Sequence, residues 1–287
     1  MTHHTAPLPI IGAACGLGAP DHRCGSGPQA LRQALQASPR PELLWRELID
    51  CGLVAEGETA ALQAFLARLA EACAAALNTA DRIAVVGGDH ACAMGTWRGV
   101  RQAVDAPLGL IWIDAHLDAH TPASSPSGRW HGMPVADLLG QCHPGEAGVI
   151  DPRHLCLVGV RSYEGAEREL LQGLGVRVIT MKEIQRRGFD AAMAEAVEIA
   201  SRAPAFGVSI DLDALDPGEA PGVGSPVVGG LHAAELLAWL PRLAAAPRLR
   251  AVELAEFNPV IDVEQRTLKL VLQMLTLASG GSHESDH

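Results

Sequence analysis

Three short motifs carry side chains of the types that bind metal ions. The first is Asp114-Ala-His116-Leu-Asp118, which directly follows the apolar run Leu108–Ile113. Two carboxylates and an imidazole this close would repel and desolvate one another without a cation. A polar loop with a capping aspartate is the simpler alternative, but it does not explain three such side chains straight after a buried strand. The motif therefore predicts a metal site.

Two further motifs stand at the ends of other apolar runs. Asp211 and Asp213 repeat the acidic spacing after Ala205–Ile210, and His90 follows Gly87-Gly88-Asp89. Helix capping explains one acidic motif but not two on separate strands, and a single histidine after glycines is weak evidence by itself. Because the carboxyl ends of parallel strands meet at one edge of a sheet, we expect the three motifs to converge there.

The combined set of side chains indicates which metal ions the site would hold. Four carboxylates and two imidazoles suit Mn²⁺ best, with Ni²⁺, Co²⁺ and Zn²⁺ as alternatives. Six ligands are too many for one catalytic ion that keeps an open coordination position. The sequence therefore predicts two ions that share carboxylates.

Short apolar segments alternate with longer segments of helical period, which predicts an α/β fold on a mainly parallel sheet with helices on both faces. We expect one catalytic domain over residues 1–279, a flexible tail at 280–287, and a long loop over Ala119–Trp130. The expected strands are Leu8–Ala13, Arg82–Val86, Leu108–Ile113, His154–Val160, Val176–Thr180, Ala205–Ile210 and Leu249–Leu254. The expected helices are Pro28–Leu35, Glu58–Leu77, Cys92–Val104, Ala191–Arg202, Ala233–Ala244 and Val263–Ala278.

Composition excludes several classes of partner. The chain has 287 residues and a formal net charge of −11, whereas nucleic-acid binding needs a basic face. The N-terminus does not resemble a secretory signal, and no run of 18 apolar residues indicates a membrane span. The seven cysteines are scattered and form no CxxC pair, as is typical of reduced thiols. We expect a cytoplasmic protein that binds neither nucleic acid nor membrane.

Four sequence motifs together resemble one enzyme family. GGDH, DAHLDAH, SIDLDALDP and AVELAEFNP, in this order, are similar to the ureohydrolases (arginase, agmatinase and formiminoglutamase), and most like the arginases. The resemblance runs from Ile10 to about Leu277. It implies a three-layer α/β/α sandwich on a sheet of about eight strands. It also implies hydrolysis of guanidino or amidino groups with two Mn²⁺ ions and a bridging hydroxide, in a homotrimer or homohexamer.

The resemblance assigns each predicted ligand to one or both of the two ions. Asp114 and Asp211 would bridge the ions, and Asp118 counts among the catalytic residues as well as the ligands. The first ion would be held by His90, Asp114, Asp118 and Asp211, and the second by His116, Asp114, Asp211 and Asp213.

Two more residues match catalytic positions of the family. His131 matches a histidine that shuttles protons, a task that suits its ordinary pKa. Glu256 matches a carboxylate that grips the guanidinium group through paired hydrogen bonds. The simpler alternatives are a solvent-facing histidine at a helix start and an ordinary polar residue at a strand end.

The segment after Asp118 resembles the arginase loop that binds the amino-acid end of arginine, so L-arginine, cleaved to ornithine and urea, is the expected substrate. Ser127 matches a carboxylate-contacting serine. His120 and Arg129 replace asparagines, Glu164 replaces an aspartate that holds the α-amino group, and His232 replaces a threonine. Arg129 could form an ion pair with a carboxylate. A reshaped pocket could instead take 4-guanidinobutyrate or N-hydroxyarginine, and agmatine or formiminoglutamate is a further alternative.

Three rival functions belong to other classes. A single-zinc deacetylase of the related fold would use an adjacent pair of histidines, and the sequence has such a pair only at His3-His4. A non-catalytic subunit would be expected to lose ligands, and none is lost here. A metal-storage or sensor protein would not need His131 or Glu256.

Overall fold

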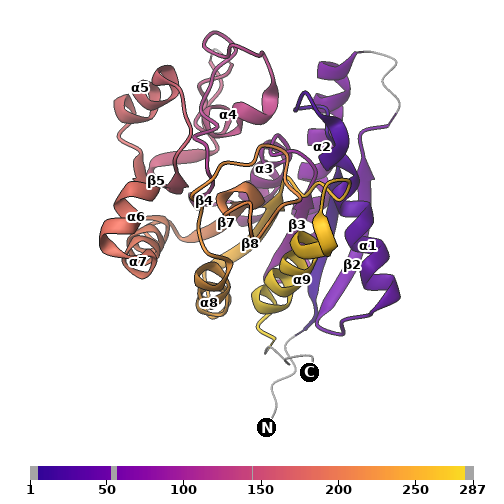
Figure 1. The fold of residues 1–287 in the computed structure, drawn as a ribbon. Helices are drawn as coiled ribbons and strands as arrows, with labels where there is room; N and C mark the ends of the chain where they lie inside the picture. The colour runs from indigo at the N-terminus through magenta and orange to yellow at the C-terminus, as the bar shows by residue number, and fades with distance from the viewer. Residues whose placement is uncertain (1–5, 53–56, 144, 282–287) are drawn as a thin grey trace.

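The structure, a computed structural model, describes residues 6–52, 57–143 and 145–281. Within these residues eight strands form one all-parallel sheet in the order β2-β1-β3-β8-β7-β4-β5-β6 (Figure 1). The strands are β1 (Leu8–Ala14), β2 (Leu43–Asp50), β3 (Ile83–Gly87), β4 (Leu108–Ile113), β5 (Ile150–Val160), β6 (Arg177–Thr180), β7 (Ala205–Asp211) and β8 (Leu249–Ala255).

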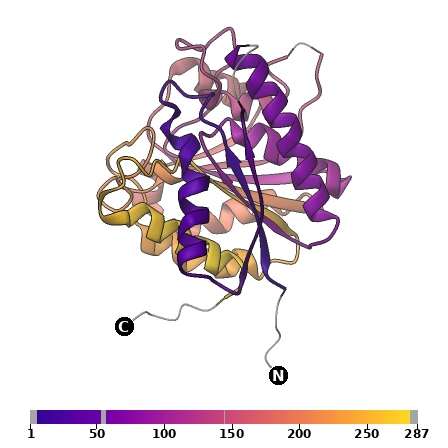
Figure 2. The same cartoon turned by 90° about the vertical axis from the view of Figure 1, so that its right-hand side faces the viewer.

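Helices cover both faces of the sheet and form two separate cores with it. Ile10 of β1 packs into one core and its neighbour Ile11 into the other, because successive side chains of a strand point to opposite faces. Figure 2 shows α1 and α2 on opposite sides of the strands. One face carries α1 (Gly27–Ala37), α6 (Met181–Arg187), α7 (Phe189–Ala200), α8 (Ala233–Ala244) and α9 (Arg266–Ala278). The other carries α2 (Glu58–Leu77), α3 (Cys92–Val104), α4 (Pro134–Leu138) and α5 (Gly165–Gly173). The predicted three-layer sandwich is confirmed.

One described helix, α2, is long and apolar enough to cross a membrane, with 20 residues and a mean hydropathy of 1.4. It packs on the sheet instead: Leu62, Phe65 and Leu69 are fully buried in the core that it shares with α3. The apolar composition of α2 therefore serves here to pack the helix against the core.

Elements missing from the sequence prediction lack continuous apolar runs. Strand β2 pairs only with β1, at the edge of the sheet, and its polar Arg46 and Glu47 are exposed. An edge strand needs no second buried face, so its sequence is mixed. The short helices α4, α5 and α6 were also not predicted. Most of the predicted tail, residues 282–287, lies outside the described residues.

The cysteines are free thiols in the structure. All seven lie in the described part of the chain, and none is in a disulfide. Six of them are buried.

Candidate active site and metal centre

Four adjacent strands at the centre of the sheet, β3, β8, β7 and β4, end at the same place. His90 follows β3, Glu256 follows β8, β7 ends at Asp211, and Asp114 follows β4. The last paired residues of β4 and β7 directly precede Asp114 and Asp211, so these two aspartates lie side by side. The parallel order thus brings the predicted motifs to one edge, as expected from the sequence.

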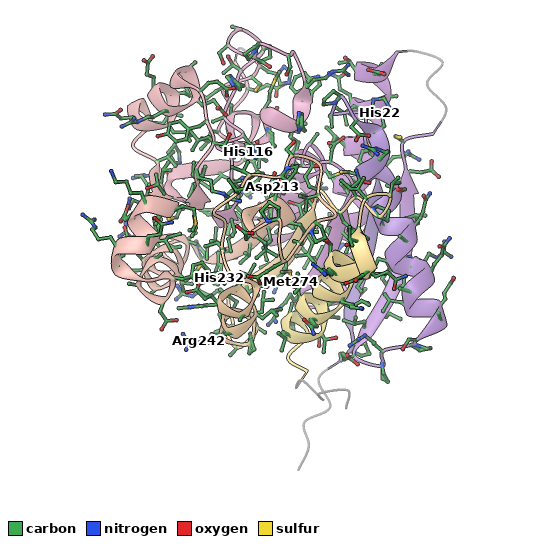
Figure 3. All side chains as sticks on the ribbon, in the orientation of Figure 1. His22, His116, Asp213, His232, Arg242 and Met274 are labelled. Carbon is green, nitrogen blue, oxygen red and sulfur yellow. The ribbon has the colours of Figure 1, made fainter. Side chains whose placement is uncertain are left out.

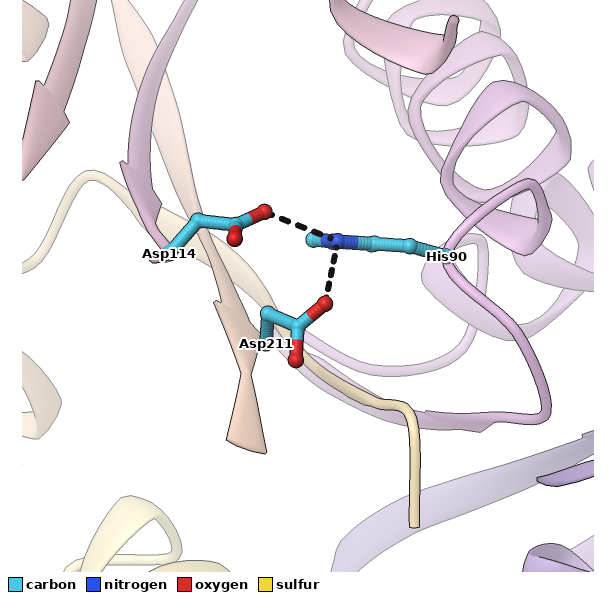
Figure 4. A group of neighbouring side chains, drawn as sticks. All are labelled: His90, Asp114 and Asp211. Atoms are coloured by element: carbon cyan, nitrogen blue, oxygen red, sulfur yellow. Dashed lines mark ion pairs between the residues drawn. The ribbon is translucent and has the colours of Figure 1, made fainter. Parts of the chain in front are cut away.

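The first cluster of possible ligands surrounds the imidazole of His90. Its Nδ1 lies 3.2 Å from Asp114 Oδ2 and 3.1 Å from Asp211 Oδ2 (Figure 4). Asp118 Oδ2 lies 3.2 Å from the same nitrogen. All four residues are buried, and the predicted ligands of the first ion are therefore together.

Hydrogen bonds on the far side of the ring fix the orientation of His90. Its Nε2 lies 2.9 Å from Ser209 Oγ, and that hydroxyl donates to Glu253 Oε2 at 2.7 Å. Since the serine proton goes to Glu253, Ser209 accepts from Nε2–H, and Nδ1 faces the carboxylates. This buried Nδ1 makes no hydrogen bond of acceptable geometry. An unpaired nitrogen among three carboxylates fits a cation.

Removing the hydroxyl that holds His90 is expected to weaken metal binding. Ser209→Ala leaves Nε2 without its partner, so we expect the affinity of the first ion to fall about 10-fold to 100-fold. Calorimetric titration with Mn²⁺ measures this. Ser162→Ala, in the same pocket, is the control and should bind Mn²⁺ as the unaltered chain does. Equal affinities in both variants would refute the role of Ser209.

A second cluster shares Asp114 with the first. His116 Nδ1 lies 3.4 Å from Asp114 Oδ1 and 3.1 Å from Asp213 Oδ2. Figure 3 shows His116 and Asp213 close together. The two oxygens of Asp114 thus serve different clusters, as a bridging carboxylate would. Asp211 lies in the first cluster only, and its other oxygen, Oδ1, accepts from the backbone N–H of Asp213.

The electrostatics of the two clusters favour a bound cation. Burial and the charge of Asp114 raise the pKa of Asp118 to about 7. Burial and neighbouring carboxylates also raise the pKa of Asp211 far above its usual range. Burial opposes the ionisation of Asp114, but the nearby imidazoles of His116 and His90 hold its pKa below the ordinary value. Divalent cations would relieve this crowding of negative charge.

Glu256 and His131 stand beside the clusters. The carboxyl of Glu256 accepts from the backbone N–H of His90 at 2.9 Å, and burial and the charge of Asp89 raise its pKa to about 8. His131 Nδ1 lies 3.9 Å from Glu256 Oε1. Burial and the charge of His116 lower the pKa of His131 to about 4. His131 is therefore neutral at pH 7 and able to accept a proton.

A cavity of about 290 Å³ connects these groups. Its inner part presents the ligand histidines and carboxylates with Glu256 and His131. Its outer part presents Ser127 and the pair His120–Glu164, in which Nε2 lies 2.9 Å from Oε2. The arrangement can hold metal ions at one end and a polar group of a substrate at the other.

The chain is similar to known proteins over nearly its whole length. The model of the Arginase family matches residues 6–279. An arginase from Bacillus caldovelox is 35% identical over 94% of this chain and 96% of its own length. The chain belongs to the arginase family. An arginase from Agrobacterium fabrum is 31% identical over 94% of this chain and 90% of its own. The crystal structure of arginase from Bacillus subtilis has a TM-score of 0.87 at 32% identity, covering 97% of this chain and 99% of that one.

Membership of the arginase family confirms the resemblance drawn from the sequence motifs. It also confirms the predicted class of enzyme, a metal-dependent hydrolase of guanidino substrates. The two ligand clusters agree with the binuclear metal dependence of this family.

Two residues predicted to bind substrate do not line the cavity of this arginase-family chain. Arg129 Nη1 instead pairs with Glu58 Oε2 of α2 at 3.2 Å. His232 directly precedes α8, its side chain is 74% exposed, and it pairs with Glu219. Figure 3 shows His232 well apart from His116 and Asp213. The structure therefore gives neither Arg129 nor His232 a contact with the cavity.

Several residues of the site were not assigned from the sequence. Ser209 stands two positions before Asp211 on β7, hence on the same face, and this spacing could have identified it. Glu253 is a single acid inside the apolar strand β8, which is also a recognisable signal. Ser225 and Glu167 line the cavity, and Cys24 contacts Glu256. No local pattern marks Cys24, because its partner is 232 residues away.

Proposed function

We propose that this chain is an arginase that hydrolyses L-arginine to ornithine and urea with two divalent cations. The observation that carries the proposal is the pair of histidine–carboxylate clusters that share Asp114 in a cavity also lined by Glu256 and His131. The similarity to proteins named arginase supports arginine as the substrate.

Each group near the clusters has a place in this reaction. Two divalent cations, when bound, supply a water of lowered pKa as the nucleophile near neutral pH. Glu256 accepts N–H groups of the guanidinium and orients its carbon toward the clusters. His131, whose pKa is lowered to about 4, takes up a proton as a neutral imidazole and passes it to the leaving amine. Its ring is 26% exposed, so the proton can also exchange with solvent.

The outer end of the cavity supports a substrate with an ammonium group. Glu164 is the exposed carboxylate there, and Glu167 already accepts from the backbone N–H groups of Ala119 and Glu164. Arg129 pairs with Glu58, so it is not placed to bind the carboxylate of a substrate that has no ammonium group. L-Arginine has the ammonium group that Glu164 would hold, with Ser127 available to its carboxylate.

The rival functions fit the site less well. A single-zinc enzyme needs one ligand cluster, whereas the described residues hold two histidine–carboxylate clusters that share Asp114. A non-catalytic subunit or a metal-storage protein would not require Glu256 to be held buried beside His131.

Three finer assignments are also proposals. Mn²⁺ is favoured by the mixed oxygen and nitrogen ligands. The family resemblance supports a homotrimer or homohexamer, and the absence of CxxC pairs supports a cytoplasmic location. Metal analysis of the purified protein and sedimentation equilibrium test the first two.

A substrate panel tests the proposed reaction. With Mn²⁺ bound, we expect kcat/KM for L-arginine to exceed that for agmatine, and agmatine to exceed 4-guanidinobutyrate by at least about 10-fold, since the last lacks the ammonium group. Urea release measures each rate. Fastest turnover of agmatine would refute arginine as the preferred substrate. Fastest turnover of 4-guanidinobutyrate would refute the role of Glu164.

A further inference from the structure

The thiol of Cys24 lies against the carboxylate of Glu256. Cys24 belongs to a short 3-10 turn, His22–Ser26, that leads into α1, and Glu256 follows β8. Sγ lies 3.1 Å from Glu256 Oε2 and 3.6 Å from the backbone oxygen of the same residue. Cys24 is 1% exposed and does not line the cavity. The thiol therefore contacts Glu256 from behind the site.

Each oxygen of the Glu256 carboxylate has its own donor from the protein. Oε1 accepts from the backbone N–H of His90 at 2.9 Å, and Oε2 accepts from the Cys24 thiol. Two donors on two oxygens fix both the position and the plane of a carboxylate. Without Cys24 only one of these two contacts would remain, and the carboxylate could rotate.

The backbone around Glu256 is built to hold this geometry. Glu256 has a φ of +68°, a left-handed conformation that is unfavourable for a residue with a side chain. Its N–H donates to the backbone oxygen of Gly88 at 2.8 Å. A Cβ on Gly224 would overlap Glu256 Oε2 and lie 3.2 Å from Cys24 Sγ, so only glycine leaves room there. Strain of this kind persists where the surroundings fix a functional side chain.

The chemistry of a buried thiol suits the task. Burial and the charge of Glu256 raise the pKa of Cys24 well above its ordinary value, so the group stays a thiol and can donate. A substrate cation favours the ionised form of Glu256. A thiol is a weak donor, so it leaves most of the resulting negative charge available to that cation.

We propose that Cys24 is a positioning residue whose S–H group holds the Glu256 carboxylate in the orientation that receives the guanidinium of the substrate. This inference rests on the proposed function, because Glu256 has a guanidinium to receive only if the chain acts on such substrates.

Kinetics of three variants test the role of Cys24. Cys24→Ala should raise KM for L-arginine about 5-fold with kcat changed less than about 2-fold, because Glu256 binds the guanidinium before and during the reaction. Cys24→Ser keeps a donor and should restore KM to within about 2-fold. Cys156→Ala, a buried thiol of β5, is the control and should leave both constants unchanged. Circular dichroism melting confirms that each variant is folded.

A spectroscopic measurement tests the contact without any reaction. The infrared S–H stretch that is lost in Cys24→Ala should lie at lower frequency than the one lost in Cys156→Ala, because its acceptor is a carboxylate. Glu256→Gln should move it to higher frequency. A Cys24 band that does not respond to Glu256→Gln, or equal KM values in Cys24→Ala and the unaltered chain, would overturn the inference. Failure of the unaltered chain to hydrolyse any guanidino substrate would overturn the proposed function instead, while the infrared result would still report on the contact.

Discussion

Replacing Asp114 with asparagine is expected to release both metal ions and to lower kcat/KM by at least about 1000-fold. Among the described residues, Asp114 alone belongs to both ligand clusters: Oδ2 lies 3.2 Å from His90 Nδ1 and Oδ1 lies 3.4 Å from His116 Nδ1. The amide of asparagine removes one negative charge and leaves a single oxygen, so it cannot serve two cations. Loss of either ion removes the source of the nucleophile.

Metal stoichiometry and activity must be measured on the same sample. Inductively coupled plasma mass spectrometry after dialysis gives the number of metal ions per chain, and urea release gives the rate of hydrolysis. Asp216→Asn is a matched control from the same motif as Asp211, because Asp216 accepts only from backbone N–H groups and belongs to neither cluster. It should keep two ions. An Asp114→Asn variant that keeps both ions and its activity would refute the shared ligand.

The sequence was sufficient to predict the metal centre because its residues follow strands directly. Asp114 and Asp211 each stand at the end of a buried apolar run, so the parallel sheet alone brings them together. Their spacing of two residues to His116 and Asp213 repeats in both motifs. Where the backbone of a regular element fixes the direction of a side chain, sequence pattern is a reliable guide.

The outer end of the cavity could not be predicted in the same way. Arg129 stands in a loop, and its direction depends on Glu58, which is 71 residues away and on another layer of the fold. His232 precedes a helix, and its partner Glu219 turns it away from the cavity. Long side chains on loops take the direction of whichever tertiary partner they find, and no local pattern encodes that partner.

The metal-free protein is expected to lose stability as the pH rises from 6.5 to 8. Asp118 and Glu256 have pKa values raised to about 7 and about 8, so over this range the folded chain binds more protons than the unfolded chain. The raised pKa of His116 acts in the same direction, because its stabilising charge is lost only as the pH rises. The lowered pKa of His131 acts in the opposite direction, but only below its ordinary value of 6.5. The free energy of unfolding of the metal-free protein therefore falls as the pH rises above 6.5.

Asp118→Asn isolates one contribution to this slope. In metal-free protein at pH 8 the variant should melt about 5 °C higher than the unaltered chain, because it lacks a buried charge whose raised pKa corresponds to about 2 to 4 kcal/mol. At pH 5 the carboxyl is protonated in the folded chain, so the two melting temperatures should converge. Calorimetry of chelator-treated protein measures both.

Once metal is present, the same substitution should reduce the stability that the folded chain gains from binding it. Added Mn²⁺ stabilises the unaltered chain by binding only its folded state, and Asp118→Asn, which lacks one ligand, should gain less. Asp151→Asn is the control: Arg153 lowers the pKa of this partly exposed carboxyl to about 2, so its removal should not raise the metal-free melting temperature. If Asp118→Asn melted lower than the unaltered chain at pH 8 without metal, repulsion among the buried carboxylates would not be what destabilises the metal-free protein. A higher metal-free melting temperature together with a smaller gain from Mn²⁺ would show that this site gives up stability in order to bind metal.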